Sequence, residues 1–302
     1  MSSTALLYGT LDAPSRQRRP VSPRVWTCVG ALAIPLWATW PCLAIRTFEI
    51  PPLEFLAMMF LVGWLVLASL HRPTKTGIDR LSKRSWLPAA AFAVSLSGGD
   101  IAFIAATHRI PAAQANLISY LWPVMIVVFG AAIGLFRLRL RHIIGLGLGF
   151  SGAVILIWDG RISMSLSGIG LALLNGAFWA GYCILRLAWK KPAENVLARG
   201  CAISALLCAS LHVFLEPTLI PSLGGLVATA AAGILPLALG NFVWDQGFRR
   251  GDSQLLAVMA YATPLCSALL LAALGVALFT WNLFVGAVVI VLAGVISRTD
   301  AY

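Results

Sequence analysis

Long apolar stretches separated by short polar segments run through the whole sequence. Ten of them are long enough to cross a bilayer, which takes about 20 mainly apolar residues in a helix. They cover residues 25–45, 53–71, 86–106, 112–135, 142–158, 166–187, 197–215, 223–247, 253–276 and 281–297. No connection between them is long enough for a soluble domain. The pattern predicts an all-α polytopic protein with ten transmembrane helices, surrounded by the lipid bilayer.

The second half of the sequence repeats the first. Residues 116–134 return 141 residues later as residues 257–275. Matching residues at this offset include Tyr120 and Tyr261, Pro123 and Pro264, Gly134 and Gly275, Arg109 and Arg250, and Asp100 and its isostere Asn241. One added residue in the first loop of a half makes the offset 142 in the first helix, which pairs Ala38 with Ala180 and Trp40 with Tyr182. A constant offset that carries these residue types together indicates an internal duplication.

The duplication predicts the domain organisation. Each half holds five helices, and because five is odd the second half enters the membrane from the opposite side. Inverted repeats of this kind are typical of secondary transporters, with the substrate site near the midplane. We predict a cytoplasmic tail at 1–24, a first five-helix repeat at 25–160, a second, inverted repeat at 161–298 and a C-terminal tail at 299–302.

Composition agrees with a membrane protein and explains the net charge. Hydrophobic residues make up 60% of the chain and charged residues 11%, whereas a soluble domain carries about 25% charge. The net charge is +11, but 19 of the 22 Lys and Arg fall in tails and loops assigned to one side, and the others are Arg46, Arg109 and Arg161. By the positive-inside rule both termini are cytoplasmic. The basic charge therefore reports orientation, and we expect no nucleic-acid partner.

Cysteine usage predicts neither a disulfide framework nor a metal site. The six cysteines lie within the apolar stretches and form no C-x-x-C pair, so we interpret them as small apolar side chains. We expect no metal, no cofactor and no catalytic residue. Because no small-residue cleavage site follows the first helix, we expect this helix to be retained.

Aromatic side chains in the first and sixth helices are candidates for a cavity wall. Trp37 and Trp40 lie in the first helix, and Asn175, Trp179 and Tyr182 lie in the sixth at i, i+4 and i+7, which places them on one face. Membrane Trp and Tyr usually lie at the interfaces, whereas Trp37 and Trp179 fall near the midplane. Packing against neighbouring helices is the alternative interpretation.

Asp100 is the one acidic residue well inside a predicted span, since Asp245 lies near the cytoplasmic end of its helix. A carboxylate at the centre of a span costs about 2.5–3.5 kcal/mol, and such residues are functional candidates. Proton coupling or recognition of a substrate ammonium group would explain it. A structural role, with a hydrogen bond to Asn116 or an ion pair with Arg109, is equally open.

A proline in the fourth helix is matched by one in the ninth. Three residues of the fourth helix share one face: Asn116, Tyr120 and Pro123. Because a helix-interior proline displaces the carbonyl four residues earlier, Pro123 is expected to free the oxygen of Ser119, and Pro264 that of Ala260. Hinges, substrate contacts and simple packed kinks all remain open.

The second half adds further candidates for the same cavity. These are Asn241 and Trp244 in the eighth helix and Tyr261, Thr263 and Pro264 in the ninth. Together the candidates predict a wall that is mainly aromatic, with few polar groups and almost no charge.

Glycines in the fifth and tenth helices favour a scaffold role, because small residues at four-residue spacing let helices approach closely. One of these segments, residues 149–152, also matches the G-x-S-G element of rhomboid-type intramembrane serine proteases. That chemistry needs a histidine near Ser151. The histidines all fall at helix ends or in loops: His71, His108, His142 and His212. We therefore expect no enzyme.

Three stretches together resemble a known family. They are NGAFWAGYCILR at 175–186, GGDIAFIAATHRIPAAQANLISYLWP at 98–123 and GNFVWDQGFRRGDSQLLAVMAYATPLCSALL at 240–270. They are similar to the EamA branch of the drug/metabolite transporter superfamily, and within it most similar to the YddG-type exporters of aromatic amino acids. Many EamA proteins end the fourth and ninth helices with Gly-Glu, whereas here Gly134 precedes Leu135 and Gly275 precedes Val276.

The resemblance implies a secondary transporter that exports aromatic and other neutral amino acids across a bacterial inner membrane. We expect a monomer that works by alternating access. The alternatives are a related exporter of nucleosides, cystine or cationic drugs, and a channel, with the intramembrane protease a remote one.

Overall fold

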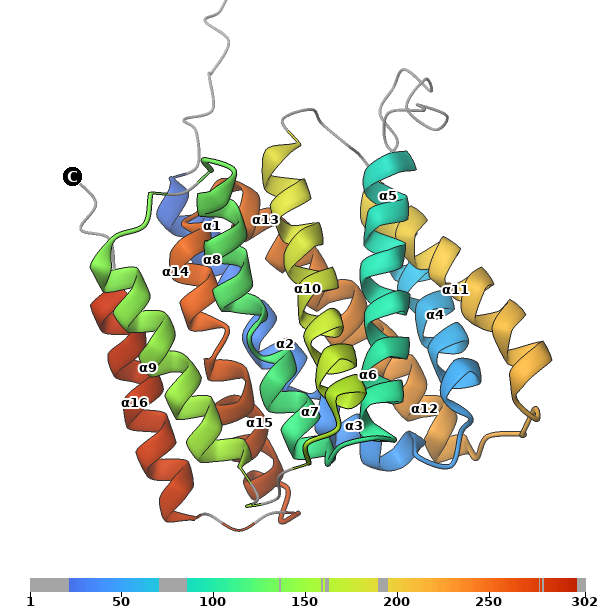
Figure 1. Ribbon diagram of the computed structural model, residues 1–302. Helices are drawn as coiled ribbons and strands as arrows, with labels where there is room; N and C mark the ends of the chain where they lie inside the picture. Colours follow the sequence, from blue (N-terminus) through green and yellow to red (C-terminus); the bar gives the residue numbers. More distant parts are fainter. Residues whose placement is uncertain are drawn as a thin grey trace, which may run out of the picture.

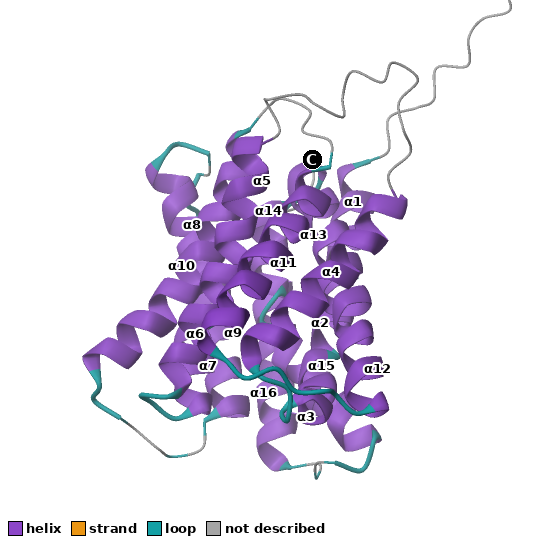
Figure 2. Ribbon diagram, turned by 90° about the vertical axis from the view of Figure 1, so that its right-hand side faces the viewer, coloured by secondary structure: helices purple, strands orange, loops and turns teal. Residues whose placement is uncertain are grey.

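The structure is a computed structural model that describes residues 22–70, 86–135, 137–158, 160, 163–189, 195–276, 278 and 280–297. Within these ranges it is all-helical, with no strand (Figure 2). Nine helical segments are long and apolar enough to cross a membrane, and one further apolar helix, α16, is shorter at 17 residues. Residues 1–21 of the predicted N-terminal tail, the predicted C-terminal tail, His71 and Arg161 lie outside the described residues.

The helices form a bundle in which α9 and α16 lie at one edge and α4, α11 and α12 at the opposite edge (Figure 1). We call the face at the bottom of Figure 1 the lower face; it carries the connections at 48–51, 108–111 and 216–222. The opposite, upper face carries the upper ends of α5, α10 and α13.

Five helices run without interruption. They are α4 (Pro52–Leu70), α9 (Leu140–Ile157), α10 (Leu166–Ala188), α11 (Val196–Leu215) and α16 (Trp281–Ser297). In an unbroken helix every interior backbone group is satisfied within the segment, which suits a lipid environment.

The remaining spans are interrupted. The first consists of α1 (Pro23–Ala31), α2 (Ala33–Ala38) and α3 (Trp40–Thr47); the third of α5 (Trp86–Ala93), η3 (Val94–Gly98) and α6 (Gly99–Thr107). The others are α7 (Ala112–Ser119) with α8 (Trp122–Ala132), α12 (Leu223–Ala232) with η4 (Gly233–Gly240) and α13 (Asn241–Arg250), and α14 (Ser253–Met259) with α15 (Ala262–Ala273). Prolines at 35, 41, 123, 236 and 264 account for most of the interruptions.

Two π-helical segments occupy equivalent positions of the repeat. The offset of 141 residues places η3 (Val94–Gly98) on residues 235–239, which lie within η4 (Gly233–Gly240). Each segment directly precedes a candidate polar residue, Asp100 after Gly99 in the first half and Asn241 in the second. Sequence analysis did not predict them, and π-helical turns are frequent at functional sites.

The repeated glycines Gly134 and Gly275 end α8 and α15 with the same geometry. Their φ angles are +75° and +71°, a left-handed conformation that glycine adopts at no steric cost. In each case the next residue's N–H reaches back to close the helix end, from Leu135 to the oxygen of Gly130 at 2.7 Å and from Val276 to that of Leu271 at 2.9 Å. Helix termination therefore explains why the repeat keeps glycine here.

Glycines set the close approach of α9 and α16. A Cβ added at Gly152 would lie 2.6 Å from Cγ1 of Ile290 and 3.1 Å from the oxygen of Gly286. Gly147, on another face of α9, has nothing within 4 Å of such an atom. Only part of the glycine run therefore serves helix packing.

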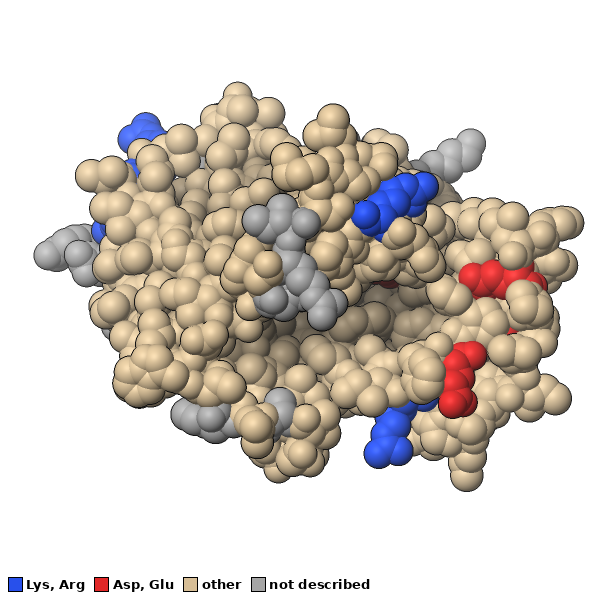
Figure 3. Space-filling view, turned by 60° about the horizontal axis from the view of Figure 1, so that its bottom comes forward, with Lys and Arg blue, Asp and Glu red and all other residues tan. Residues whose placement is uncertain are grey.

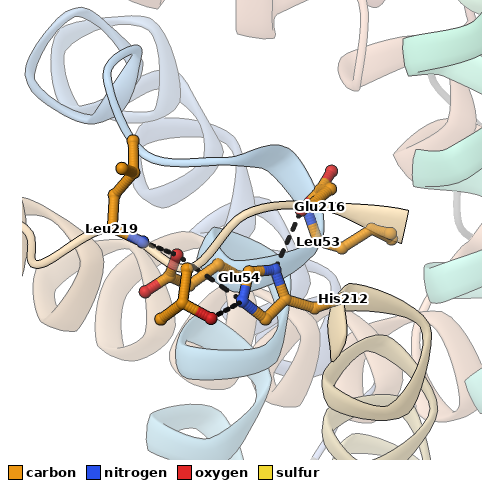
Figure 4. A network of polar contacts seen from close by, with 6 residues as sticks. Leu53, Glu54, His212, Glu216 and Leu219 are labelled. Carbon is orange, nitrogen blue, oxygen red and sulfur yellow. Dashed lines mark hydrogen bonds and ion pairs between the residues drawn. The ribbon is translucent and has the colours of Figure 1, made fainter. Parts of the chain in front are cut away.

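A polar cluster ties α4 to α11 at the lower face (Figure 4). Both carboxylate oxygens of Glu216 accept from the backbone N–H of Leu53, at 3.2 and 2.9 Å. His212 Nδ1 lies 3.1 Å from Glu216, and Glu54 accepts from the N–H of Leu219 at 3.1 Å. Glu216 thus caps the N-terminus of α4, where a negative charge is favourable, and fixes these two helices antiparallel to one another.

Candidate functional site

A cavity of about 530 Å³ lies in the middle of the bundle and opens at the lower face (Figure 3). Its mouth is formed by the end of α3, the following connection and the start of α4, through Thr47, Phe48, Ile50 and Pro52. Its deeper wall comes from the interrupted spans together with α4 and α10. Figure 3 shows the opening as a trough, with acidic and basic side chains near one end.

Nine of the fourteen residues that sequence analysis named as candidates line this cavity. They are Trp37, Trp40, Asp100, Asn116, Tyr120, Asn175, Trp179, Asn241 and Thr263. They come from segments as far apart as α2 and α15, and the fold brings them to one place.

The structure places the other five candidates outside the lining: Pro123, Tyr182, Trp244, Tyr261 and Pro264. Pro123 was expected to share a face with Asn116, but the break at residues 120 and 121 separates α7 from α8, so the regular i, i+7 spacing no longer applies. Tyr261 is fully buried, and its ring packs on Gly149 of α9 rather than facing the cavity. Tyr182 and Trp244 are only 4% and 1% exposed, and they lie between the closed inner end of the cavity, which we call its floor, and the upper face.

Tryptophans from three separate helices form the floor, and the buried Trp244 packs against them from the upper-face side. The Trp37 ring lies 6.3 Å from Trp122, 6.0 Å from Trp179 and 5.0 Å from Trp244, measured between centroids. Trp122 also contacts Trp179 at 6.4 Å and Trp244 at 5.6 Å, mostly edge to face. Sequence analysis missed Trp122; its place beside the repeated Pro123 was the available signal.

Asp100 is the only charged residue among those that line the cavity. In the part of the chain that the structure describes, its carboxylate has no hydrogen bond or ion pair. Arg109, one of the two expected partners, instead donates to the backbone oxygen of Ala105 at 2.6 Å, and within the described ranges no hydrogen bond joins Asn116 to Asp100. The structural role considered for Asp100 is therefore not seen in this conformation, and Asp100 is one of the residues that line the cavity.

Other polar groups of the cavity divide into paired and unpaired ones. Asn175 donates to the backbone oxygen of Gly99 at 2.9 Å, and Ser119 Oγ donates to that of Ala172 at 3.2 Å. The buried hydroxyls of Ser95 and Thr263 have no protein partner in the described ranges. Because an unpaired buried hydroxyl costs about 1–3 kcal/mol, these two groups are available to a ligand or to water.

The two prolines were predicted to free the backbone oxygens of Ser119 and Ala260, and these two oxygens have different surroundings in the structure. The oxygen of Ala260 accepts a hydrogen bond from the N–H of Thr263 at 3.0 Å, so the prediction that Pro264 leaves it free is wrong. The chain tightens into a turn at Tyr261, which satisfies the oxygen locally. In the first half the oxygen of Ser119 faces Gly176 of α10 instead.

A buried ion pair lies above the floor. Arg186 of α10 donates from Nε and Nη2 to the two carboxylate oxygens of Asp245 of α13, at 2.7 and 2.9 Å. Arg249 adds a longer contact of 3.5 Å to the same carboxylate. The side chains of Arg186 and Asp245 are 3% and 8% exposed. By sequence, Arg186 falls at the end of its helix among the charges next to the following loop, and nothing nearby in the sequence shows that it meets Asp245.

Among the residues that the structure describes, Ser151 has no histidine as a hydrogen-bond partner. Its hydroxyl is exposed on α9 and donates to the backbone oxygen of Gly147 at 2.8 Å. His142 is buried in the first turn of the same helix, and His212 is held in the polar cluster with Glu216. Neither histidine is within hydrogen-bonding reach of the Ser151 hydroxyl, which a general base requires.

Comparison with known proteins agrees with the cavity's character. The model of the EamA-like transporter family matches residues 24–158. An aromatic amino acid exporter YddG of Ancylobacter novellus is 31% identical over 258 residues, which cover 83% of this chain and 89% of that one. The exporters of the same name from Salmonella typhimurium and Escherichia coli are 25% and 24% identical, with 87% of this chain covered.

A solved crystal structure superposes with a TM-score of 0.83 at 30% identity, covering 91% of this chain and 98% of that one. The likeness thus extends over both halves, beyond the residues that the family model matches. The chain therefore belongs to the EamA-like transporter family and is a membrane transporter, not an enzyme.

Proposed function

We propose that this protein exports aromatic and other neutral amino acids across the bacterial inner membrane. The observation that carries the proposal is the cavity: aromatic rings form its floor, and a single unpaired carboxylate, Asp100, lies in its wall. The relatives that are named aromatic amino acid exporters support the substrate class.

The wall offers a counterpart for each part of such a substrate. Rings of Trp37, Trp122 and Trp179 provide edges and faces for an aromatic side chain, and such pairs contribute about 0.5–1.5 kcal/mol each beyond area burial. Asp100 would accept from the ammonium group in a charge-assisted hydrogen bond. The Asn116 amide and Tyr120 hydroxyl are donors for the carboxylate. A cavity of about 530 Å³ falls within the range of small-molecule sites, about 300–1,000 Å³.

We place the upper face in the cytoplasm, with both termini there, and interpret the chain as two inverted five-helix repeats in a monomer. The distribution of Lys and Arg supports this orientation. The antiparallel packing of α4 and α11, which correspond in the repeat, supports the inversion. On this assignment the cavity opens to the outside and is closed toward the cytoplasm, as expected for one state of an alternating-access cycle.

Counterflow in liposomes tests the proposal. Vesicles that contain the purified protein are loaded with unlabelled phenylalanine, and uptake of labelled phenylalanine is followed. We expect saturable, transient accumulation that threonine and leucine inhibit and adenosine does not. A folded protein that shows no counterflow would contradict the amino-acid assignment, and conduction without saturation would indicate a channel.

Export of cationic drugs is the second candidate, because Asp100 is the only charge in the lining. Phenylalaninamide separates the two, since it keeps the ring and the ammonium group but lacks the carboxylate. If phenylalaninamide competes as well as phenylalanine does, the site recognises cations. We expect phenylalanine to compete better.

A further inference from the structure

A substrate path through the bundle would run from the cavity, open at the lower face, to the upper face, which is closed. Residues that correspond in the repeat lie at both ends of this path, but in different environments. The offsets of 142 and 141 residues pair Trp40 with Tyr182 and Phe103 with Trp244. Trp40 and Phe103 line the open cavity, whereas Tyr182 and Trp244 are 4% and 1% exposed above its floor. The same positions are thus open at the lower end and closed at the upper end.

Above the floor the closed end is packed in two layers. Trp244 stacks on Phe248 at 5.3 Å, and Tyr182 lies 4.7 Å from Phe92 and 5.7 Å from Trp179. The Arg186–Asp245 pair follows directly, since Asp245 is the residue after Trp244 in α13. The upper end is therefore closed by aromatic rings and then by an ion pair that joins α10 to α13.

The lower end has the aromatic positions but lacks the ion pair. The residues that correspond to Arg186 and Asp245 are Ala44 and Ile104, and Ile104 lines the open cavity. At these two positions, closing the lower end would bring together apolar side chains and no pair of opposite charges. Opening the upper end, in contrast, must separate two buried charges, which is costly unless water replaces the partner.

We propose that the Arg186–Asp245 pair locks the upper end of the substrate path, and that Trp40 and Phe103 close the lower end once the lock opens. This inference rests on the alternating-access part of the proposed function. The asymmetry between an ionic upper gate and an apolar lower gate makes the state with the cavity open at the lower face the preferred one. Arg249, at 3.5 Å from the same carboxylate, contributes less to the lock.

Thiol labelling tests the lock, and the chain carries a reporter for it. Cys183 is 1% exposed and lies in α10 between Tyr182 and the ion pair, so it becomes accessible only when the upper end opens. A variant in which Cys183 is the sole cysteine reports the upper end. A second variant, with Ile104→Cys as the sole cysteine, reports the lower end. Both are labelled in detergent with a bulky polar maleimide.

Asp245→Asn is introduced into both reporters. We expect Cys183 to be labelled at least about tenfold faster and the cysteine at 104 to be labelled more slowly, because the population moves toward the upper-open state. The double variant Arg186→Asp with Asp245→Arg restores a pair of opposite charges and should return both rates toward those of the parent. Arg249→Gln should produce a smaller change of the same sign.

Two outcomes would overturn the lock. If Cys183 labels faster while the rate at 104 does not change, the substitution only loosens α13 locally. If neither rate changes in a folded Asp245→Asn protein, the pair has no part in gating. If Asp245→Asn does not fold, the double variant Ala44→Arg with Ile104→Asp is made in the Cys183 reporter, which places an ion pair at the lower end. This pair should favour closing of the lower end and so speed Cys183 labelling. An unchanged rate contradicts the proposal.

Phenylalanine counterflow of the unsubstituted protein, measured in parallel, keeps this inference separate from the proposed function. Absent counterflow with the expected labelling changes would leave the gate in place and remove the substrate assignment. Normal counterflow with unchanged labelling would keep the substrate assignment and remove the gate.

Discussion

The helices around the cavity and the α9–α16 pair are built from similarly apolar sequence but differ in regularity. The cavity is lined largely by spans that change helix type or break within the membrane, such as α5–η3–α6 and α7–α8. The α9–α16 pair is unbroken and held by close backbone approach at Gly152 and Gly286.

This difference shows where a membrane protein tolerates irregular backbone. A break leaves carbonyl and N–H groups that lipid cannot satisfy, so it persists only beside protein or a water-filled cavity. The breaks at residues 120–121 and 260–261 lie beside Gly176 of α10 and within a buried turn, respectively. Irregular segments therefore supply most of the site, joined by the unbroken α4 and α10, whereas the regular α9–α16 pair lies outside the cavity lining.

The largest expected effect is on the α9–α16 pair. Gly152→Leu places a side chain where a Cβ would already lie 2.6 Å from Ile290, and overpacking typically costs about 1–3 kcal/mol or more. We expect a large loss of folded protein and a lower unfolding temperature in detergent. Gly147→Leu, in the same helix with nothing within 4 Å, is the matched control, and equal losses in both variants would contradict the packing role.

Asp100→Asn removes the single charge of the cavity wall. A hydrogen bond to a charged group is worth about 1.5–3 kcal/mol, so we expect KM for phenylalanine in counterflow to rise by about 10- to 100-fold while the unfolding temperature changes little. Glu49→Gln, at an exposed position of the lower face, should leave KM unchanged. A normal KM in Asp100→Asn would remove Asp100 from the substrate site.

Trp179→Ala removes one ring from the floor. Its contacts with Trp37 and Trp122, at 6.0 and 6.4 Å, and its contact with an aromatic substrate are each worth about 0.5–1.5 kcal/mol. We expect phenylalanine transport to fall by about tenfold and threonine transport by less. Trp281→Ala, at a ring 75% exposed on α16, controls for loss of a tryptophan; parallel decreases for both substrates in Trp179→Ala would argue against ring stacking.

The smallest effect is expected at Ser151, whose hydroxyl bonds only to the backbone of its own helix. Substitutions away from packed or paired features usually change stability by less than about 0.5 kcal/mol. Ser151→Ala should therefore transport phenylalanine like the parent protein. A clear loss of transport would show that the Ser151 hydroxyl has a role in transport.

The predicted spans agree closely with the helices, because an apolar stretch of this length has few other ways to satisfy its backbone in a membrane. The membrane class was predicted from the apolar stretches, and the transporter family from the resemblance of short motifs; the comparisons confirm the family. Asp100 and Trp179, which line the cavity, were singled out by sequence because their residue types are unusual at that depth, and Tyr120 because it recurs in the repeat.

The interruptions within the helices could be predicted only in part from the sequence. Prolines marked most of the breaks, but η3 contains no proline and lies against α10 and α11, neighbours that its local sequence does not specify. The side-chain directions of Tyr261 and Pro123 were likewise mispredicted, because a break changes the rotation of everything beyond it.

What the sequence alone determined is the position and length of its apolar segments and the constant offset at which matching residues recur, since both are local or periodic properties of the chain. Only the tertiary structure decided which equivalent residues face the cavity and which are buried, and that Arg186 meets Asp245, 59 residues away. Two halves with related sequences can pack differently because each residue's environment is set by the helices around it, and periodicity does not specify those neighbours.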